Sequence, residues 1–169
     1  VHGGPGPIGA IVCHGMLSSK DSPKYAHLAK QLGLRNVPSL RFDFSGRGES
    51  DGSLFELTYS RQIEDLDAAV EYMVAAGCER LAVFGSSMGG AVAILMAARD
   101  ERIVAIATMA AVAHPEEMVE RYPEQVAKWQ EQGFLETNAG RIGTAFIADA
   151  EAHDVLSSAR ILVAPLHVI

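Results

Sequence analysis

The chain has 169 residues, of which 49% are hydrophobic and 21% are charged, and this composition is typical of one globular domain with a sizeable core. Its formal net charge of -7, with no run rich in lysine and arginine, argues against a nucleic-acid-binding surface and gives no reason to expect affinity for anionic lipid. No apolar run reaches the roughly 18 residues that a membrane span needs, and no basic and apolar leader precedes the first predicted strand, so we expect a cytoplasmic protein.

Apolar runs predict four buried strands in the first two thirds of the chain, at residues 8–13, 37–42, 81–84 and 103–109. Helical patterns occupy the three intervals between them, and Ser22 and Thr58 are suited to cap the first two helices. Gly33 and Gly77 are suited to end these helices. The regular alternation of strand and helix favours a mostly parallel sheet with helices on both faces, a doubly wound α/β fold.

The pattern changes after Ala111, where Pro115 and Pro123 each begin a short helical piece. We interpret residues 112–157 as a small helical cap inserted over the sheet edge, and an ordinary connecting pair of helices is the alternative. Residues 161–169 predict a further strand that enters the sheet. We therefore treat residues 1–169 as one domain.

Cysteine usage indicates no metal chemistry. Cys13 and Cys78 each lie at or beside a predicted strand, and their spacing is not that of a metal site. We expect a reduced, buried pair, no metal and no cofactor.

The stretch Gly85-Ser86-Ser87-Met88-Gly89-Gly90 joins a predicted strand to a predicted helix and contains the pattern G-x-S-x-G. A serine at the apex of so tight a turn has a strained backbone, and side chains two positions before and after it would collide, which explains Gly85 and Gly89. The strain directs the Ser87 hydroxyl out of the sheet, where the positive end of the helix faces any anion formed beside it. A small-residue turn with an incidental serine is the alternative, but the order strand, elbow, helix favours a nucleophile.

Two other loops follow strands of the predicted sheet. His14-Gly15-Met16 follows the first strand, and a glycine-rich loop over residues 43–52 follows the second. The second loop contains Gly46-x-Gly48 without the third glycine of a dinucleotide-binding fingerprint. Because ligands bind at the carboxyl ends of parallel strands, we expect both loops to lie beside Ser87.

These three stretches together resemble the α/β-hydrolase superfamily, and within it the esterase and lipase-like branch that includes cinnamoyl (feruloyl) esterases and monoacylglycerol lipases. His14-Gly15-Met16 resembles the family's oxyanion loop, residues 41–50 its D-x-x-G-x-G-x-S loop, and residues 85–90 its nucleophile elbow. The resemblance implies that Ser87 is the nucleophile and that the backbone N–H groups of Met16 and Met88 form the oxyanion hole. Both methionine side chains are then free to shape an apolar pocket.

The resemblance also implies strands that precede Ile8 and follow Ile169, so we expect the chain to be a central part of the family's catalytic domain. In the family the acid and the histidine of the triad come after the last strand predicted here. Within the chain, His114 and His153 are the histidines after Ser87 that we weigh as a base, and Asp43 is expected to structure its loop. The chain alone is therefore not expected to be a competent esterase.

The leading hypothesis is a cytoplasmic serine hydrolase that cleaves carboxylic esters through an acyl-enzyme on Ser87. Trp129, Phe134 and Phe146 of the short cap, with the methionines at the oxyanion positions, predict an apolar pocket that prefers small to medium or aromatic acyl esters. The alternatives are a non-catalytic binding protein of the same fold, or a thioesterase or peptidase, because fold does not determine function. We also expect self-association through the last strand, since it lies at an open edge of the sheet.

Overall fold

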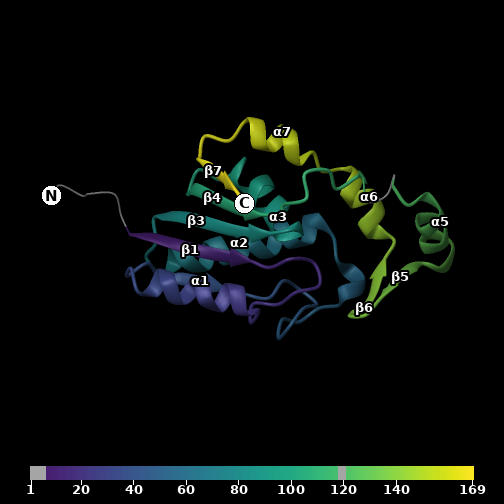
Figure 1. Cartoon of the computed structure of the whole chain (residues 1–169), viewed down its shortest axis with the longest axis horizontal. Helices are drawn as coiled ribbons and strands as arrows, with labels where there is room; N and C mark the ends of the chain where they lie inside the picture. The colour runs from purple at the N-terminus through teal and green to yellow at the C-terminus, as the bar shows by residue number, and fades with distance from the viewer. Residues whose placement is uncertain (1–6, 118–120) are drawn as a thin grey trace.

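The computed structural model describes residues 7–117 and 121–169, and its centre is a five-stranded parallel sheet in the order β2-β1-β3-β4-β7 (Figure 1). The strands are β1 (Ile8–Cys13), β2 (Ser39–Arg41), β3 (Arg80–Ser86), β4 (Ile103–Met109) and β7 (Leu166–Val168). Every pair of neighbouring strands in this sheet is parallel, which confirms the α/β fold expected from the sequence.

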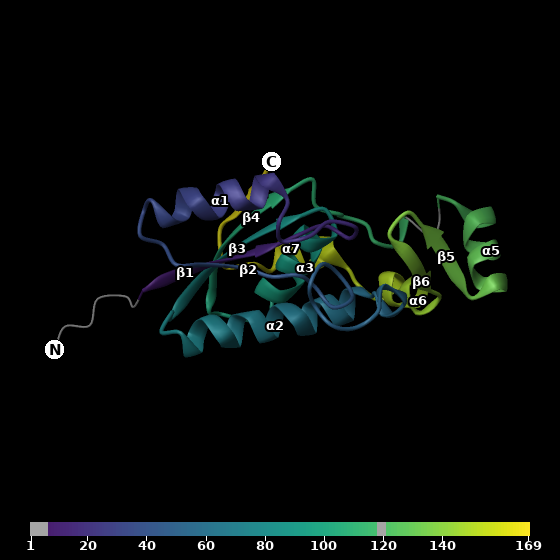
Figure 2. The same cartoon turned by 90° about the horizontal axis from the view of Figure 1, so that it is seen from below.

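Helices cover both faces of the sheet. Helix α1 (Pro23–Gly33) lies on one face, and α2 (Tyr59–Ala75) and α3 (Met88–Ala97) lie on the other (Figure 2). The side chain of Thr58 caps α2 as predicted, because its Oγ1 accepts from Arg61 N–H at 3.0 Å. Ser22 occupies the N-cap position of α1, but its side chain forms no capping hydrogen bond.

The core lies between β1, β3 and the helices on the α3 face. Residues 9–13 of β1 are buried without interruption, and residues 88–96 of α3 are buried on every side. Such continuous apolar runs are characteristic of elements covered on both faces, which is why they show no alternation of apolar and polar residues. The nucleophile elbow leads directly into α3, whose residues are buried along this whole stretch.

Two strand predictions were too long. The run 37–42 is a strand only over Ser39–Arg41, since Pro38 cannot donate to a ladder. The run 161–169 is a strand only over Leu166–Val168, because α7 (Val155–Arg160) and Pro165 precede it. In the described residues β7 has one sheet neighbour, β4, and the self-association expected at this edge stays a prediction.

The 112–157 segment contains more than the helices expected there. It holds α5 (Pro123–Gln132), the antiparallel hairpin of β5 (Phe134–Thr137) and β6 (Gly140–Gly143), and α6 (Ala145–Glu151). The hairpin was not predicted from the sequence, because its strands have four residues each and show no alternation of apolar and polar residues. The helical piece expected at Pro115 falls partly outside the described residues, which stop at 117 and resume at 121.

The 112–157 segment lies beyond the carboxyl ends of β1 and β3 (Figures 1 and 2). Its centre is aromatic: Trp129 stacks on Phe146 with ring centroids 5.7 Å apart, and Phe146 lies 5.8 Å from the ring of Tyr59 on α2. Trp129 Nε1–H donates to Ile142 C=O at 2.9 Å, which ties α5 to the hairpin.

Asp149 of α6 joins this segment to the main sheet domain. Its Oδ2 accepts from Tyr59 N–H at 2.6 Å and from Ser60 N–H at 3.2 Å, so it supplies partners for the first N–H groups of α2. A carboxylate at a helix N-terminus is also favoured by the helix dipole.

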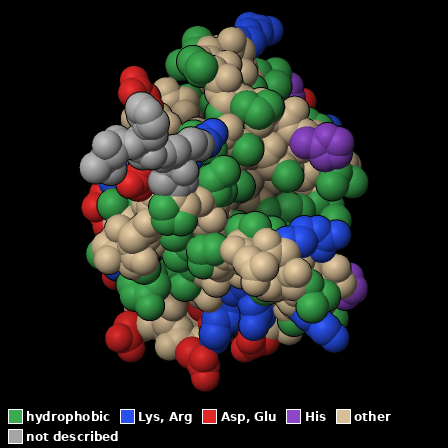
Figure 3. Space-filling view, turned by 90° about the vertical axis from the view of Figure 1, so that its left-hand side faces the viewer, with side chains coloured by type: hydrophobic (Ala, Val, Ile, Leu, Met, Phe, Trp, Pro, Cys, Tyr) green, Lys and Arg blue, Asp and Glu red, His purple; other side chains and the backbone are tan. Residues whose placement is uncertain are grey.

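The opposite edge of the sheet, at the amino ends of the strands, is rich in apolar side chains (Figure 3). A hollow of about 510 Å³ on this side is lined by residues 97–101, 103–104, 161 and 163–165. It lies at the far end of the strands from Ser87.

None of the described helices has the length and apolar character that crossing a bilayer requires.

We predict that Asp149→Ala lowers the free energy of unfolding by about 1 kcal/mol, because two N–H groups at the start of α2 lose their acceptor. Urea denaturation followed by circular dichroism measures the change. Glu151→Ala on the same helix is the matched control and is expected to change stability by less than about 0.5 kcal/mol. Equal stability of the two variants would contradict the role assigned to Asp149.

Candidate active site

Ser87 occupies the sharp turn between the end of β3 and the start of α3. Its backbone has φ +52° and ψ -123°, a conformation that L-residues rarely adopt and that costs roughly 1–3 kcal/mol. Ser87 N–H donates to Met109 C=O at 2.9 Å, and Ser87 C=O accepts from Gly90 N–H at 2.9 Å, so the turn is held on both sides. The Ser87 residue is exposed, while Ser86 and Met88 beside it are buried.

The glycines of the elbow are required by contacts with backbone. A Cβ on Gly85 would overlap the carbonyl group of Gly89, and a Cβ on Gly89 would overlap the carbonyl oxygen of His14. The sequence predicted the first collision. The structure adds the second, in which the start of α3 packs directly against the end of β1.

The same contacts bring the loop after β1 against the nucleophile. A Cβ on Gly15 would lie 3.4 Å from both Ser87 Cβ and the Ser86 carbonyl oxygen, so Gly15 lies directly beside the elbow. Cys13 and Gly85 are register partners on the adjacent strands β1 and β3, which puts the residues after them at the same level. Residues 14–16 and Ser87, which the sequence analysis singled out separately, therefore lie together.

Met16 and Met88 each have a backbone N–H that donates to no acceptor within residues 7–117 and 121–169. Met88 is the first residue of α3, and the first N–H groups of a helix have no partner inside it. Gly15 C=O, which belongs to the same peptide unit as Met16 N–H, accepts from His14 Nδ1–H at 2.8 Å and from Ser18 N–H at 3.0 Å. Because C=O and N–H of a trans peptide point in opposite directions, these two bonds fix the direction of Met16 N–H.

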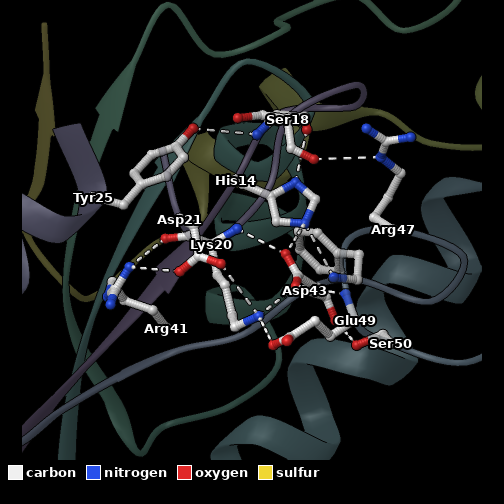
Figure 4. Close-up of polar contacts among 12 residues, drawn as sticks. His14, Ser18, Lys20, Asp21, Tyr25, Arg41, Asp43, Arg47, Glu49 and Ser50 are labelled. Carbon is white, nitrogen blue, oxygen red and sulfur yellow. Dashed lines mark hydrogen bonds and ion pairs between the residues drawn. The ribbon is translucent and has the colours of Figure 1, made fainter. Parts of the chain in front are cut away.

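The His14 side chain is buried, with 1% of its surface exposed, and acts as a bridge between two loops. Phe44 N–H can only donate, so His14 Nε2, 3.1 Å away, is the acceptor and Nδ1 carries the proton given to Gly15 C=O (Figure 4). This arrangement requires a neutral imidazole. Burial lowers the pKa of His14 below its usual value, although Gly15 C=O and the carboxylate of Asp43 oppose the shift.

Asp43 organises the glycine-rich loop and ties it to the loop after β1 (Figure 4). Its carboxylate accepts from Lys20 N–H at 2.7 Å, Lys20 Nζ at 2.8 Å and Glu49 N–H at 3.0 Å. Gly48 has φ +52°, and a Cβ there would overlap this carboxylate. Burial acts to raise the pKa of Asp43, but the hydrogen bonds from Lys20 and Glu49 outweigh it and hold the pKa below its usual value.

Neither histidine that follows Ser87 and was weighed as a base reaches it. His114 Nδ1 lies 2.9 Å from Glu116 Oε1, and His153 Nε2 lies 3.0 Å from Ser60 Oγ. Within the described residues the Ser87 hydroxyl has no hydrogen-bond partner, so the structure supplies a nucleophile and backbone donors but brings no base to them.

The expectation for the methionine side chains needs one correction. Met88 is 2% exposed and packs in the core, so it does not line a pocket, whereas Met16 is only partly buried. Among the described residues, no group of three His, Cys, Asp or Glu side chains is arranged to hold a metal ion.

Three cationic or aromatic side chains that contact the elbow or the loop after β1 were not predicted from the sequence. Lys24 Nζ donates to Ser86 Oγ at 3.0 Å, and Gly15 N–H donates to the Tyr25 hydroxyl at 3.4 Å. Arg47 donates from Nη2 to Leu17 C=O at 3.0 Å and from Nε to Ser18 C=O at 3.3 Å. Only Arg47 lay in a recognised stretch, where its position between two glycines was the available signal.

A doubly wound sheet with a serine on a strand-to-helix elbow, beside a backbone loop from the neighbouring strand, defines an α/β-hydrolase. Residues 9–160 match the hydrolase family described as Serine aminopeptidase, S33, and the chain belongs to this family. The resemblance recognised in the sequence is thereby confirmed.

Solved structures of low sequence identity share the fold. The chain superposes on Est1E from Butyrivibrio proteoclasticus, solved with ferulic acid bound, with a TM-score of 0.84 at 21% identity, and the match covers 96% of this chain and 67% of Est1E. It also superposes on mouse alpha/beta hydrolase domain-containing protein 10 with a TM-score of 0.74 at 22% identity, over 95% of this chain and 78% of that one.

Among curated proteins, an uncharacterized 31.7 kDa protein from the traX-finO intergenic region of Escherichia coli is 29% identical over 114 residues. The match covers 64% of this chain and 39% of that protein, so the chain spans well under half the length of this relative.

We predict that Gly89→Ala lowers the free energy of unfolding by about 3 kcal/mol or more, because its Cβ meets backbone that cannot move without separating α3 from β1. Gly33→Ala is the matched control: nothing lies within 4 Å of its Cβ, and stability should change by less than about 0.5 kcal/mol. Thermal and urea denaturation measure both. Similar stability of the two variants would show that the close packing of Gly89 is not needed.

We also predict that stability falls as the pH is lowered from about 7 to 5. In the unfolded chain His14 takes up a proton near pH 6.5, whereas in the folded protein the pKa of His14 is lower. Below about pH 6.5 the unfolded state therefore binds one more proton than the folded state, and this lowers the free energy of unfolding. Urea midpoints across this range measure the slope. His14→Asn should be less stable at pH 7.5 with a flatter slope, and exposed His27→Asn should retain the wild-type slope. An unchanged slope in His14→Asn would contradict the assignment.

Proposed function

We propose that this chain carries the nucleophile and the oxyanion donors of a serine hydrolase that cleaves carboxylic esters. One observation carries the proposal: the exposed Ser87 lies on a strained elbow directly beside Gly15, where the N–H groups of Met16 and Met88 are free of acceptors within the described residues. These are the components that acyl transfer requires around a serine, apart from the base.

The chemistry follows from this arrangement. Ser87 Oγ attacks the ester carbonyl carbon and loses its proton to a base, while the carbonyl oxygen becomes an oxyanion beside the two N–H groups. The intermediate collapses to an acyl-enzyme and the alkoxide leaves as an alcohol after taking the proton. Water then attacks the acyl group, the carboxylic acid is released, and Ser87 is regenerated.

The proposal assigns the base to a histidine oriented by a carboxylate in a part of the protein that follows Ile169. The geometry of His114 and His153 supports this assignment, since both are engaged with other groups, Glu116 and Ser60. The solved relatives support it as well, because the chain covers 67% of Est1E. We propose in addition that the 112–157 segment acts as a cap over the site, on the evidence of its place beyond the carboxyl ends of β1 and β3.

We propose small esters with apolar or aromatic acyl groups as substrates, and Est1E with bound ferulic acid supports hydroxycinnamoyl esters as the first to test. Trp129 and Phe146 are at most 4% exposed and form the interior of the 112–157 segment, so they support the acyl preference less than the sequence suggested. The family's description as an aminopeptidase makes aminoacyl amides the necessary comparison.

We predict that a fluorophosphonate probe labels Ser87 in the complete enzyme and that Ser87→Ala lowers kcat on p-nitrophenyl and hydroxycinnamoyl esters by about 10³-fold or more. The neighbouring variant Ser86→Ala is the control and should still be labelled. The measurements are mass spectrometry of the labelled peptide and initial rates on matched ester and aminoacyl anilide substrates. Label on Ser86, or faster hydrolysis of the anilides than of the esters, would refute the proposal.

A further inference from the structure

The loop that carries Met16 N–H is held by side chains from a distant part of the chain. We call residues 14–20 the oxyanion loop. Two successive carbonyl groups of this loop accept from the guanidinium of Arg47. The Leu17 C=O lies 3.0 Å from Nη2, and the Ser18 C=O lies 3.3 Å from Nε (Figure 4). Since the guanidinium is planar and rigid, two of its N–H groups on adjacent carbonyls fix both the position and the tilt of the loop.

Arg47 is itself held firmly. It lies in a turn in which Arg47 N–H donates to Phe44 C=O and Arg47 C=O accepts from Ser50 N–H, both at 2.9 Å. Gly46 and Gly48 on either side have φ of +72° and +52°, conformations that glycine adopts readily. The half-buried Arg47 side chain is therefore presented from a rigid turn, which Asp43 anchors from inside.

A short series of bonds links this guanidinium to the oxyanion donor. Arg47 holds Ser18 C=O, Ser18 N–H donates to Gly15 C=O at 3.0 Å, and Gly15 C=O belongs to the peptide unit of Met16 N–H. If the Leu17-Ser18 backbone moves, one of the two bonds that direct Met16 N–H is lost. Displacing a catalytic group by about 1 Å costs on the order of 10²-fold in rate.

Arg47 also acts through its charge, on the hydrogen bond that joins His14 Nε2 to Phe44 N–H. His14 must be neutral to accept from Phe44 N–H, and it faces charges of both signs from several loops and helices. Asp43 Oδ1 lies 3.8 Å from His14 Nε2 and, with Asp65 of α2, favours protonation, while Arg47 opposes it. Lys20 reduces the effect of the Asp43 charge on His14, because its ammonium forms a hydrogen bond and an ion pair with the Asp43 carboxylate. Arg47 thus helps to keep His14 neutral, so that Nε2 accepts from Phe44 N–H and His14 stays joined to the loop that carries Arg47.

We propose that Arg47 is a positioning residue for the oxyanion hole: its guanidinium clamps the carbonyl groups of Leu17 and Ser18 and thereby aims Met16 N–H at the space beside Ser87. The proposal rests on the proposed esterase function. It assigns Arg47 no contact with substrate. The hydrogen bond from Met16 N–H stabilises the tetrahedral intermediate more than the bound ester, because the oxyanion forms only after attack.

The test compares Arg47→Met, Arg47→Lys and the control Arg35→Met in the complete enzyme. Arg35 lies after α1 and donates to Gln31 C=O at 2.9 Å, away from the elbow. Arg47→Met is expected to lower the burst rate of p-nitrophenol release by about 10–100-fold, with the concentration of ester at half-maximal burst rate within about threefold of wild type. Arg35→Met should leave both unchanged.

Inhibitor binding separates positioning from general damage. A trifluoromethyl ketone, which forms a tetrahedral adduct with the serine, should bind Arg47→Met more weakly by the same factor as the rate, whereas an unreactive amide analogue of the ester should bind as to wild type. The acidic limb of the pH-rate profile should move to higher pH in Arg47→Met. It should stay in place in Arg47→Lys, which keeps the charge but loses the planar pair of donors.

The outcomes separate the two proposals. If Ser87→Ala retains turnover, the proposed function fails whatever Arg47 does. If Ser87→Ala is inactive and Arg47→Met keeps its burst rate within twofold of wild type, the positioning role is overturned. Equal weakening of the ketone and the amide analogue overturns it too. If Arg47→Met does not fold, Arg47→Lys, with a melting temperature near wild type, carries the same comparison, and an unimpaired burst rate there overturns the proposal.

Discussion

The site depends on the close packing of Gly89, at the start of α3, against the carbonyl oxygen of His14, at the end of β1. This contact allows the oxyanion loop to lie against Ser87, and it requires glycine because any Cβ would overlap backbone. The strained φ of +52° at Ser87 belongs to the same arrangement. Burial of α3 on every side and the sheet ladder between β1 and β3 supply the stability that maintains this strain.

Much of the fold could be predicted because its signals are local. Continuous apolar runs gave the central strands, Thr58 and Gly77 marked the ends of α2, and the alternation of elements gave the parallel sheet. Short elements carried too little signal. The β5-β6 hairpin has no alternating pattern, and its stability comes from contacts with Trp129 and with the 3₁₀ turn Leu54–Glu56, which no window of sequence contains.

The candidate site divides in the same way. Ser87 and its glycines follow from a six-residue pattern, since the turn itself requires them. The side chains that hold the oxyanion loop come from positions up to 30 residues away, which is the separation between Arg47 and Leu17. The two glycines beside Arg47 do not by themselves distinguish it from a solvated arginine. The sequence around Met88, which is buried in the core, equally fits a methionine that lines a pocket. Tertiary contacts decide such cases, and only coordinates supply them.

The register between β1 and β3 limits which insertions and deletions the protein can accept. Cys13 pairs with Gly85, and the oxyanion loop and the elbow begin immediately after this pair. One residue added or removed between Ile8 and Cys13 would shift His14 along the strand by about 3.3 Å and turn its side chain to the other face of the sheet. The β5-β6 turn lies outside this ladder, so changes in chain length among homologues should accumulate there and be absent from β1.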